Sequence, residues 1–578
     1  MNRRTALKLL SISAGSAAIV GAEQFWKQHP KAAEPPAVAL NQVGYLPGNR
    51  KVATVGAGHA AGPFELRDSG SGQVVFRGNA GTAIHDLCSG DQVAAADFSS
   101  FQAPGKYRLA TASGESGTFA IGADVYREPL RMVTRAYYGQ RCGCAVDLGG
   151  GYRHSPCHAA GAYHPTSGRS GAVSNHGGWH DAGDYGRYVV NSGITVGTLL
   201  WAWELYPQAL RGMNLGIPES GGKIPDYLAE VRWNLEWMLS MQDADGGVWH
   251  KQTSETFCRF IMPQDDTMTS YVIGTGSPPY KSTCATADLA AVAAIAARCY
   301  GEYDAGFAQR CLAASRSAWS WAVAHPDVMF RNPPGIGTGA YEDRDGRDEI
   351  LWASAELWRT TGEAAYWDAF LTQAKALPVG TYLWMPSWPS VAALGYWTVA
   401  MSGRSGSEAV RDQVLARTAQ DTEALLARAR TSGYGQTLGP ADYIWGSNGM
   451  AANQSLLLMI SDHFQRNDEA REAALGNLHY ILGRNCFGVS WVTQIGYNPF
   501  QHPHHRPSGA DGIAAPWPGL MSGGPNASNL VDAVQPRPPM RMWVDAQYAY
   551  WMNEIAINWN APLVFLLAGA NAGVLSTS

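Results

Sequence analysis

The stretch His176-Gly-Gly-Trp-His-Asp-Ala-Gly-Asp-Tyr-Gly-Arg-Tyr188 comes directly before an apolar run with helical periodicity. It holds two carboxylates, Asp181 and Asp184, among glycines that let the backbone approach a ligand closely. In a helical turn the two carboxylates would share one face, and like charges that close raise each other's pKa unless a cation or a water lies between them. We interpret the stretch as a site that holds and activates a water. The alternative, an Asp N-cap at a helix start, accounts for only one of the two aspartates.

The chain after residue 127 is organised as about twelve apolar segments with helical periodicity. They lie at roughly 128–142, 186–205, 222–242, 284–300, 306–323, 347–361, 363–374, 388–402, 408–428, 449–464, 468–482 and 546–571. Connections after the odd-numbered segments are long, and those after the even-numbered segments are short apart from 206–221. Up-and-down helices joined in this way place every long connection at the same end, where sites are usually built. We therefore predict an (α/α)6 barrel of helix pairs. A helical solenoid is the alternative, although the sequence contains no repeated unit.

The segment between Val38 and Gly122 has the pattern of an all-β domain. Short runs typical of strands are separated by Gly, Ser and Pro turns, at 51–55, 64–67, 73–76 and 107–110. Such spacing predicts a β-sandwich of about a hundred residues. A chain of 578 residues is too long for one ordinary core, so a second domain is expected. We divide the chain into an export signal and linker at 1–36, the sandwich at 37–123 and the helical domain at 124–578.

The N-terminus has the features of an export signal. Arg3 and Arg4 are followed by a mild apolar stretch from Leu9 to Ala22, which is typical of a twin-arginine signal. A chance arginine pair on an ordinary export signal is the alternative and also predicts export, to the periplasm or the medium. No other stretch is long and apolar enough to span a bilayer.

The composition limits the possible partners. The net charge is −5, only 16% of residues are charged, and no basic patch suggests nucleic-acid binding. The 21 Trp and 25 Tyr indicate either a core rich in aromatic residues or a groove that stacks flat sugar faces. The nine cysteines are odd in number and lack the spacing of a disulfide scaffold, so at least one thiol is free or binds a metal.

The last long connection, 483–545, contains a rigid cationic cluster. His502, His504, His505 and Arg506 are braced by prolines in the run His-Pro-His-His-Arg. A metal site is possible for such residues, but the adjacent arginine favours a site that binds hydroxyl or carboxylate groups. A surface histidine cluster is the alternative.

The final apolar segment contains a lone acid, Glu554, among apolar and amide neighbours. A carboxyl group in such surroundings is expected to have a raised pKa and to remain a proton donor near neutral pH. A buried glutamate satisfied by amides is the alternative. One such acid facing two ionised aspartates is typical of an inverting glycosidase. There the acid protonates the leaving oxygen while a carboxylate about 6.5–9.5 Å away activates a water.

These motifs together resemble glycoside hydrolase family 9, a cellulase family with an (α/α)6 barrel. The resemblance is carried by Asp-Ala-Gly-Asp at 181–184, by Gly-x-Asn-x4-Pro-His-x-Arg at 496–506, and by the run at 543–561. Residues 41–47, Asn-Gln-Val-Gly-Tyr-Leu-Pro, resemble the start of the immunoglobulin-like module that precedes the barrel in one branch. The similarity extends over the chain after the linker. It implies an immunoglobulin-like sandwich followed by the barrel.

The resemblance also implies roles for individual residues. Asp184 would be the general base, Asp181 would help it hold the water, and Glu554 would be the general acid. His504 and Arg506 would bind the sugar near the cleavage point. Asp545 and Tyr550 would support the acid or the sugar. Trp179 and Tyr185 would line the cleft. Trp397 and Trp445 would either stack sugar rings or pack in the core.

A zinc site is expected beside the aspartates. Cys142, Cys157, His158 and His180 form a Cys2His2 set suited to a closed, structural zinc, and they resemble the zinc site of the same branch. Buried free thiols are the alternative. Competing candidate ligands are Cys144, His154, His164 and His176.

Calcium is the second metal that the resemblance implies. The stretch at 341–349 is acidic and contains a glycine, and oxygen ligands suit calcium. Asp348 and Glu349 resemble an Asp-Glu pair that binds calcium in family members. No third acidic ligand is present near Trp388, where we expect one, so a solvated helix start is the alternative.

The sequence thus predicts an exported, monomeric, inverting endo-β-1,4-glucanase that acts on cellulose or related β-glucans and needs no organic cofactor. Within the same family the alternative is an exo-acting cellodextrinase or exo-β-glucosaminidase. Outside it, the alternatives are a carbohydrate-binding protein without catalysis and a zinc hydrolase. The zinc hydrolase is disfavoured because four protein ligands leave no open position for water.

Overall fold

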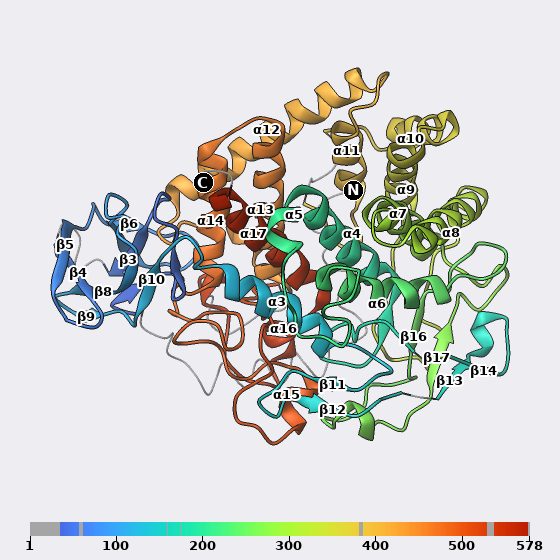
Figure 1. The fold of residues 1–578 in the computed structure, drawn as a ribbon, viewed down its shortest axis with the longest axis horizontal. Coiled ribbons are helices and arrows are strands. Elements are labelled where there is room, and N and C mark those ends of the chain that lie inside the picture. The colour runs from blue at the N-terminus through green and yellow to red at the C-terminus, as the bar shows by residue number, and fades with distance from the viewer. Residues whose placement is uncertain are drawn as a thin grey trace.

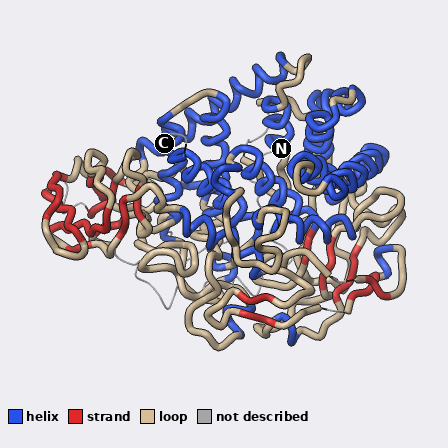
Figure 2. Tube along the Cα trace, in the orientation of Figure 1, coloured by secondary structure: helices blue, strands red, loops and turns tan. Residues whose placement is uncertain are grey.

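The computed structural model describes residues 35–56, 62–158, 160–174, 176–380, 385–528 and 537–575. The predicted export signal and nearly all of the linker therefore lie outside the described residues. Figure 1 shows strands β1 to β10 gathered at one side of a larger helical part, and Figure 2 shows strands and helices segregated in the same way. Of the described helices, not one combines the length and the apolar character that a membrane crossing requires.

The N-terminal part consists of two sheets, as the sequence predicts. Their strand orders are β1-β3-β7-β6 and β2-β10-β8-β4-β5, with β9 paired to β8. The bounds are β1 Val38–Ala39, β2 Gly44–Tyr45, β3 Val52–Gly56, β4 Pro63–Asp68, β5 Val74–Asn79, β6 Ile84–His85, β7 Gln92–Asp97, β8 Gly105–Thr111, β9 Gly114–Glu115 and β10 Phe119–Ile121. Alternate residues such as Val55 of β3 and Leu66 of β4 form one apolar core, because strand side chains point to opposite faces in turn.

The helical part contains every helix that the periodicity predicts, with the last one interrupted. The main helices are α3 Arg127–Gly139, α4 Val189–Leu205, α6 Asp226–Ser240, α7 Thr283–Tyr300, α8 Ala305–Ala324, α9 Arg347–Thr361, α10 Ala364–Ala376, α11 Ala392–Met401, α12 Glu408–Thr431, α13 Ser447–Phe464, α14 Asp468–Ile481 and α17 Ile557–Leu575. Helix α4 packs on α7, α7 on α9 and α9 on α11, while α11 and α13 both pack on α12; α13 packs on α17, which returns to α4. These contacts form a closed circuit.

The main helices fall into two groups by the extent of their burial. Nearly every side chain of α4 and α7 is buried, whereas α8 and α12 bury only one face. A helix that is apolar on all sides must lie inside the protein, and one with a single apolar stripe covers it. The amphipathic helices therefore form the outer layer.

Two helix predictions are wrong in detail. The helix expected at 546–571 is interrupted: α16 (Tyr550–Asn553) ends, Glu554 is extended with φ −61° and ψ 149°, and α17 begins at Ile557. Here hydrogen bonds to distant segments replace those of a continuous helix. Glu554 O accepts from Gly523 N, and Ile557 N donates to Asp181 O. The helix expected from residue 186 begins only at Val189, after strand β15 (Arg187–Tyr188). Asp181 and Asp184 consequently lie in a loop and do not share a helical face.

A small sheet in the first two long connections was not predicted. Its order is β14-β13-β17-β16-β15, with bounds β13 Gly161–Tyr163, β14 Ala172–Val173, β15 Arg187–Tyr188, β16 Lys251–Thr253 and β17 Ser270–Ile273. A two-stranded ladder, β11 (Val146–Asp147) with β12 (Arg153–His154), lies in the first connection. Strands this short leave no clear period in the sequence. The sheet matters because β15 follows the Asp181–Asp184 loop directly.

The sandwich and the helical part are joined by polar contacts. Asn41 Nδ2 donates to Tyr126 Oη at 3.1 Å and lies 2.9 Å from His479 Nδ1. Arg541 forms an ion pair with Asp91, and Thr54 Oγ1 donates to Gly433 O at 2.7 Å. Buried polar contacts of this kind fix one relative placement of the two parts, because leaving either partner unpaired is costly.

Candidate active site

Backbone hydrogen bonds bring the three sequence motifs together. Ile557 N donates to Asp181 O at 2.9 Å, and Arg506 N donates to Gly183 O at 3.1 Å. His504 and Glu554 form a β-bridge, with His504 N donating to Asn553 O at 2.8 Å. The loop of the two aspartates therefore lies against both the histidine loop and the segment of the lone acid.

Asp181 is held by two side-chain donors. Asn191 Nδ2 donates to its Oδ1 at 2.7 Å, and Tyr341 Oη donates to its Oδ2 at 2.5 Å. Burial, and then the charge of Asp184, raises the pKa of Asp181 to about 8, while the two donors act in the opposite direction. Asp181 is therefore largely protonated near neutral pH, which differs from the expectation that both aspartates are ionised.

Asp184 is held on one oxygen. Gly186 N donates to Oδ2 at 3.0 Å and Tyr188 Oη donates to the same atom at 3.1 Å. Burial raises the pKa of Asp184 above its usual value, and the positive charge of Arg506 opposes that rise. Both of these donors bind Oδ2. Among the described residues, no other residue donates a hydrogen bond to Oδ1, so Oδ1 is the oxygen that can bind a water.

Glu554 is partly buried, and its carboxyl group is near enough to both aspartates for their charges to act on it. Removal of its carboxyl group from water raises its pKa well above the usual value, and the charges of Asp184 and Asp181 raise it further. A hydrogen bond with Trp445 acts in the opposite direction. The carboxyl group thus remains protonated at pH values where an ordinary glutamate is ionised. This is the state of a proton donor.

His504 stands beside Glu554 as a neutral ring. Its Nδ1 lies 2.9 Å from Gln547 O, and burial lowers its pKa to about 4. A neutral ring beside a carbonyl carries its proton on Nδ1, which leaves Nε2 as an acceptor for a hydroxyl group. Phe260 and Tyr550 pack against the ring, with centroids 5.0 Å and 5.7 Å away.

Arg506 braces the backbone around the aspartates. Its Nη1 donates to Gly183 O at 2.7 Å and its Nε donates to Cys258 O at 3.1 Å. The guanidinium also lies over the rings of Phe257 and Phe260, at 5.5 Å and 5.6 Å. The structure therefore gives this residue a clear part in holding the loop of Asp184.

The other residues predicted to contact the sugar have different environments in the structure. Asp545 accepts from Gln501 N and His502 N, both at 2.8 Å, so it holds the histidine loop. Tyr550 packs on Trp445 with centroids 5.6 Å apart, and Trp445 is 41% exposed, as a sugar platform requires. Trp397 is fully buried and donates to Thr418, so it belongs to the core.

Two aromatic residues of the opening stretch pack inward. Trp179 is fully buried and its indole N–H donates to Glu230 at 2.8 Å, so the prediction that it lines the cleft is wrong. Tyr185 donates to Ile261 O at 2.6 Å and packs against the rings of His158 and His180. Both face the interior because the loop turns at the glycines around them.

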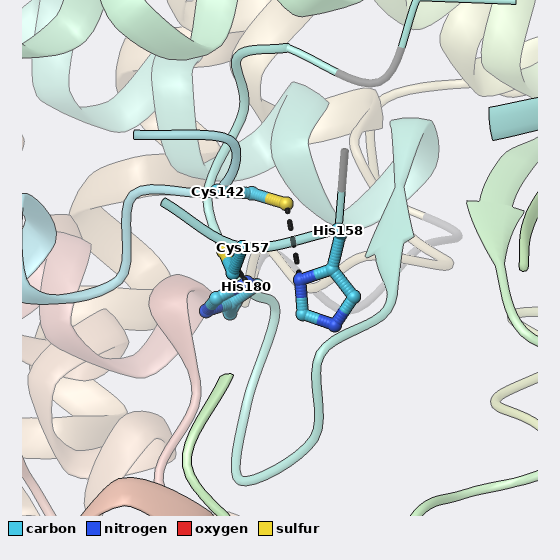
Figure 3. Close-up of side chains that lie close together, drawn as sticks. All are labelled: Cys142, Cys157, His158 and His180. Carbon is cyan, nitrogen blue, oxygen red and sulfur yellow. Dashed lines mark hydrogen bonds between the residues drawn. The ribbon is translucent and has the colours of Figure 1, made fainter. Parts of the chain in front are cut away.

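The predicted Cys2His2 set comes together in the structure (Figure 3). One ligand atom from each of Cys142, Cys157, His158 and His180 lies within 4.8 Å of all the others. Cys142 Sγ is 3.7 Å from His158 Nδ1, and Cys157 Sγ is 3.8 Å from His180 Nε2. Tetrahedral zinc, with bonds of about 2.3 Å to sulfur and about 2.0 Å to nitrogen, needs S···N separations of about 3.5 Å. The buried donor set therefore fits zinc.

The neighbours of this set fit the same interpretation. Asp266 lies 3.4 Å from His158 Nε2, where a carboxylate would orient the ring. The competing candidates lie outside the set. His154 contacts Ser155 O, His164 contacts Thr166 Oγ1 and His176 contacts Gly143 O. Cys144 is partly exposed and is not a member either.

The acidic residues at the start of α9 are also buried. Asp348 accepts from Val391 N at 2.8 Å. Both carboxylate oxygens of Glu349, and both of Asp288 on α7, lie buried without a hydrogen-bond donor among the described residues. Ligand atoms of Cys284, Asp343 and Glu349 lie within 4.8 Å of one another. So many uncompensated acceptors suit a bound cation. Asp343 belongs to the acidic stretch that was predicted to bind calcium, although it was not singled out, and Asp288 was not predicted.

Sequence reasoning missed the residues that hold the two aspartates. Tyr188 is the last residue of the opening stretch and Asn191 follows three residues later, but neither was singled out. Tyr341 lies 160 residues from Asp181 along the chain, and was noted only as the first residue of the acidic stretch. No local pattern reports a contact over such a separation.

Comparison with known proteins gives consistent matches over most of the chain. Residues 126–567 match the family described as "Glycosyl hydrolase family 9", and residues 33–116 match "Cellulase N-terminal ig-like domain". "Endoglucanase D" of Acetivibrio thermocellus is 36% identical over 544 residues, which covers 92% of this chain and 83% of that protein.

Solved structures agree with this. A metagenome-derived glycoside hydrolase family 9 endoglucanase superposes with a TM-score of 0.86 at 38% identity, covering 93% of this chain and 99% of that one. A Zn-binding triple mutant of the family 9 endoglucanase J30 gives a TM-score of 0.83 at 34% identity, covering 91% and 99%.

Gly183 offers a direct check of the packing between the aspartate loop and the histidine loop. A Cβ atom at this position would lie 1.9 Å from His504 O, so Gly183→Ala must displace the histidine loop. We expect a loss of about 1–3 kcal/mol in the free energy of unfolding, measured by urea denaturation. Gly212→Ala is the control, because a Cβ there meets no atom within 4 Å. Equal stability of the two variants would contradict the contact.

Proposed function

This chain belongs to glycosyl hydrolase family 9, and we propose on that basis that it is an inverting endo-β-1,4-glucanase acting on cellulose or related soluble β-glucans. The observation that supports this most strongly is the grouping of three carboxylates with different protonation. The raised pKa of Glu554 favours its protonated form, while the charge of Arg506 and the hydrogen bonds from Gly186 and Tyr188 favour the ionised form of Asp184. An acid and a base on opposite sides of a bond are the requirement for inverting hydrolysis.

In the proposed reaction Asp184 acts as the general base. It accepts a proton from a water that Asp181 helps to hold, and the water oxygen bonds to the anomeric carbon. At the same time the bond from that carbon to the leaving oxygen breaks, and Glu554 gives its proton to this oxygen. A single displacement of this kind inverts the anomeric centre and needs about 6.5–9.5 Å between the acid and the base.

The sugar would be held by the residues around Glu554. Nε2 of His504 can accept a hydrogen bond from a sugar hydroxyl, because the ring is neutral and Nδ1 faces Gln547 O. The exposed ring of Trp445, together with Tyr550, offers a stacking face. Asp545 and Arg506 would act through the backbone that they brace.

We also propose that the helical part is an (α/α)6 barrel, with the domain division at 37–123 and 124–578. The closed circuit of packed helices supports the barrel. The separate apolar core of the strands supports an independent sandwich. The site then lies at the end of the barrel where the long connections meet.

A glutamine at position 554 tests the function. Glu554→Gln keeps the size of the side chain but cannot donate the proton, so kcat on cellohexaose should fall by about 10²–10⁴-fold. Glu128→Gln, which removes only an exposed ion pair with Arg131, should leave kcat unchanged.

The products distinguish the remaining possibilities. Wild-type protein should release products of several lengths from internal cuts. Steady release of one short product would favour an exo-acting cellodextrinase, and turnover of glucosamine oligomers alone would favour an exo-β-glucosaminidase. Full activity of Glu554→Gln would show that this residue is not the acid. Binding without cleavage by folded wild-type protein would favour a non-catalytic carbohydrate-binding protein.

A structural zinc is the first metal that we propose. Cys142, Cys157, His158 and His180 would hold it and leave no ligand position open, so its contribution is to fix the loop beside Asp181. The Zn-binding triple mutant of endoglucanase J30 is a similar protein that binds zinc.

Calcium is the second metal. Glu349 and Asp343 would ligate it, with Asp288 and Asp348 close enough to add charge or ligands. The buried, unpartnered oxygens of Glu349 and Asp288 support this site, because several carboxylates cannot stay ionised together without a cation. The bound ion would neutralise the start of α9.

Metal analysis of purified variants tests both sites together. The wild-type protein should contain about one zinc and one calcium per chain. Cys142→Ser should lose the zinc and keep the calcium, and Glu349→Gln should do the reverse, so each variant controls for the other. Cys144→Ser, outside the zinc set, should keep both metals. Zinc retained in Cys142→Ser at full occupancy would rule out the assigned ligands.

We further propose that the enzyme is exported as a folded monomer by the twin-arginine route. The paired arginines Arg3 and Arg4 ahead of the mild apolar stretch support this. Replacing both with lysine should trap active enzyme in the cytoplasm of a bacterial host that has this route. Unchanged export would argue for an ordinary signal, and light scattering that finds a dimer would contradict the monomer.

A further inference from the structure

A buried lysine that pairs with no carboxylate lies next to the active site. Lys251, in strand β16, is 0% exposed. Its ammonium donates to Asn332 Oδ1 at 2.7 Å, to Gly339 O at 2.7 Å and to Thr338 Oγ1 at 3.2 Å. Among the described residues no carboxylate forms an ion pair with it, although the charges of Asp184 and Glu342 act on it from further away. Burying an ammonium among neutral acceptors is costly, and burial lowers the pKa of Lys251 to about 7. A buried ammonium with such a cost is expected to have a structural or functional role.

The residue before it holds the same piece of chain. His250 Nε2 lies 3.0 Å from Ala340 O, and its Nδ1 lies 3.0 Å from Ser282 Oγ. Burial lowers the pKa of His250 to about 3, so the ring is neutral and Nε2–H donates to the carbonyl. His250 and Lys251 thus bind the consecutive carbonyl groups of Ala340 and Gly339.

The segment that they bind, residues 338–341, contacts both catalytic aspartates through tyrosines. Gly339 N donates to Tyr188 Oη at 3.1 Å, and Tyr188 Oη donates to Asp184 Oδ2 at 3.1 Å. Because a backbone N–H can only donate, the hydroxyl oxygen of Tyr188 must accept here, which directs its own proton to Asp184. At the end of the segment, Tyr341 Oη donates to Asp181 Oδ2 at 2.5 Å.

Local geometry leaves this segment little freedom. Tyr341 has φ 46°, in the left-handed region that a bulky residue adopts only when its surroundings enforce it. A Cβ on Gly339 would lie 3.1 Å from the hydroxyl of Tyr188, so the backbone approaches that ring closely. Strand pairing places Tyr188 directly opposite Lys251, with the ammonium 5.6 Å from the ring centroid. The rings of Tyr188 and Tyr341 are themselves 4.8 Å apart.

We propose that Lys251 is a positioning residue for the hydrolysis: by holding residues 338–341 it aims the hydroxyl groups of Tyr188 and Tyr341 at Asp184 and Asp181. The inference rests on the proposed function, since it assigns the two aspartates their part in holding and activating water. Lys251 itself does not touch the substrate. It acts through Gly339 and Tyr188, so its loss should slow the chemical step and leave sugar binding nearly intact.

Lys251→Met, which replaces the ammonium with an apolar chain of similar length, tests the proposal on the full-length enzyme. We expect kcat on cellohexaose to fall about tenfold or more, with KM within about twofold of the wild type, because misplacing a catalytic group affects the chemical step. Tyr188→Phe should lower kcat to a similar extent. The double variant should resemble the poorer single variant, since both changes interrupt one path.

Lys281→Met is the matched control. Lys281 is also buried, but it pairs with Asp243 and Asp245 and, among the described residues, forms no hydrogen bond or ion pair with residues 338–341 or with the two catalytic aspartates. It should lose stability without losing kcat. A folded Lys251→Met with kcat within twofold of the wild type, or single effects that multiply in the double variant, would overturn the proposal. Should Lys251→Met fail to fold, Lys251→Gln decides by the same criteria.

A crystal structure of the Lys251 variant gives a readout that does not depend on glucanase activity. We expect residues 338–341 to shift and the Tyr188 hydroxyl to lose its contact with Asp184. Unchanged contacts would overturn the proposal even if kcat falls. A wild-type protein that cleaves no β-glucan would contradict the proposed function alone, and the crystal structure would then decide the positioning role.

Discussion

The structure of the active site depends on the carbonyl groups of Asp181 and Gly183. The first accepts from Ile557 N, and the second accepts from the backbone and guanidinium of Arg506. These bonds join the aspartate loop to two segments that lie more than 300 residues further along the chain. They also explain why α17 starts where it does, since the first N–H of that helix is bound to the aspartate loop. Glycine at position 183 is required because His504 O occupies the place of a side chain.

Three acids held this close would repel one another strongly if all were ionised. The structure answers this in two ways. Glu554 and Asp181 have raised pKa values, so protons remove part of the charge. Hydrogen-bond donors stabilise the remaining negative charge: Tyr188 and Gly186 bind Asp184, while Tyr341 and Asn191 bind Asp181. The resulting division between a proton donor and a proton acceptor is a direct consequence of burial and placement, and it is the division that inverting hydrolysis requires.

Patterns along the chain predicted much of the fold because they are local. Helix periodicity found the main helices, and the alternation of strand residues found the sandwich. The Cys2His2 set was predicted from ligand chemistry together with its resemblance to the zinc site of one branch of the family. The contacts of Tyr341 and Asp288 could not be predicted, because each depends on segments far apart in sequence. Glu554 was placed in a helix since its neighbours are apolar. Its true extended backbone is set by His504 and Gly523, which periodicity cannot detect.

The central claim is that Asp184 and Glu554 carry out a single displacement. Proton NMR of the wild-type enzyme acting on cellohexaose, recorded within minutes and before mutarotation, tests it most directly. The account predicts that the new reducing ends first appear as the α-anomer. Initial release of the β-anomer would show a double displacement and would contradict the assignment of Asp184 as a base acting on water.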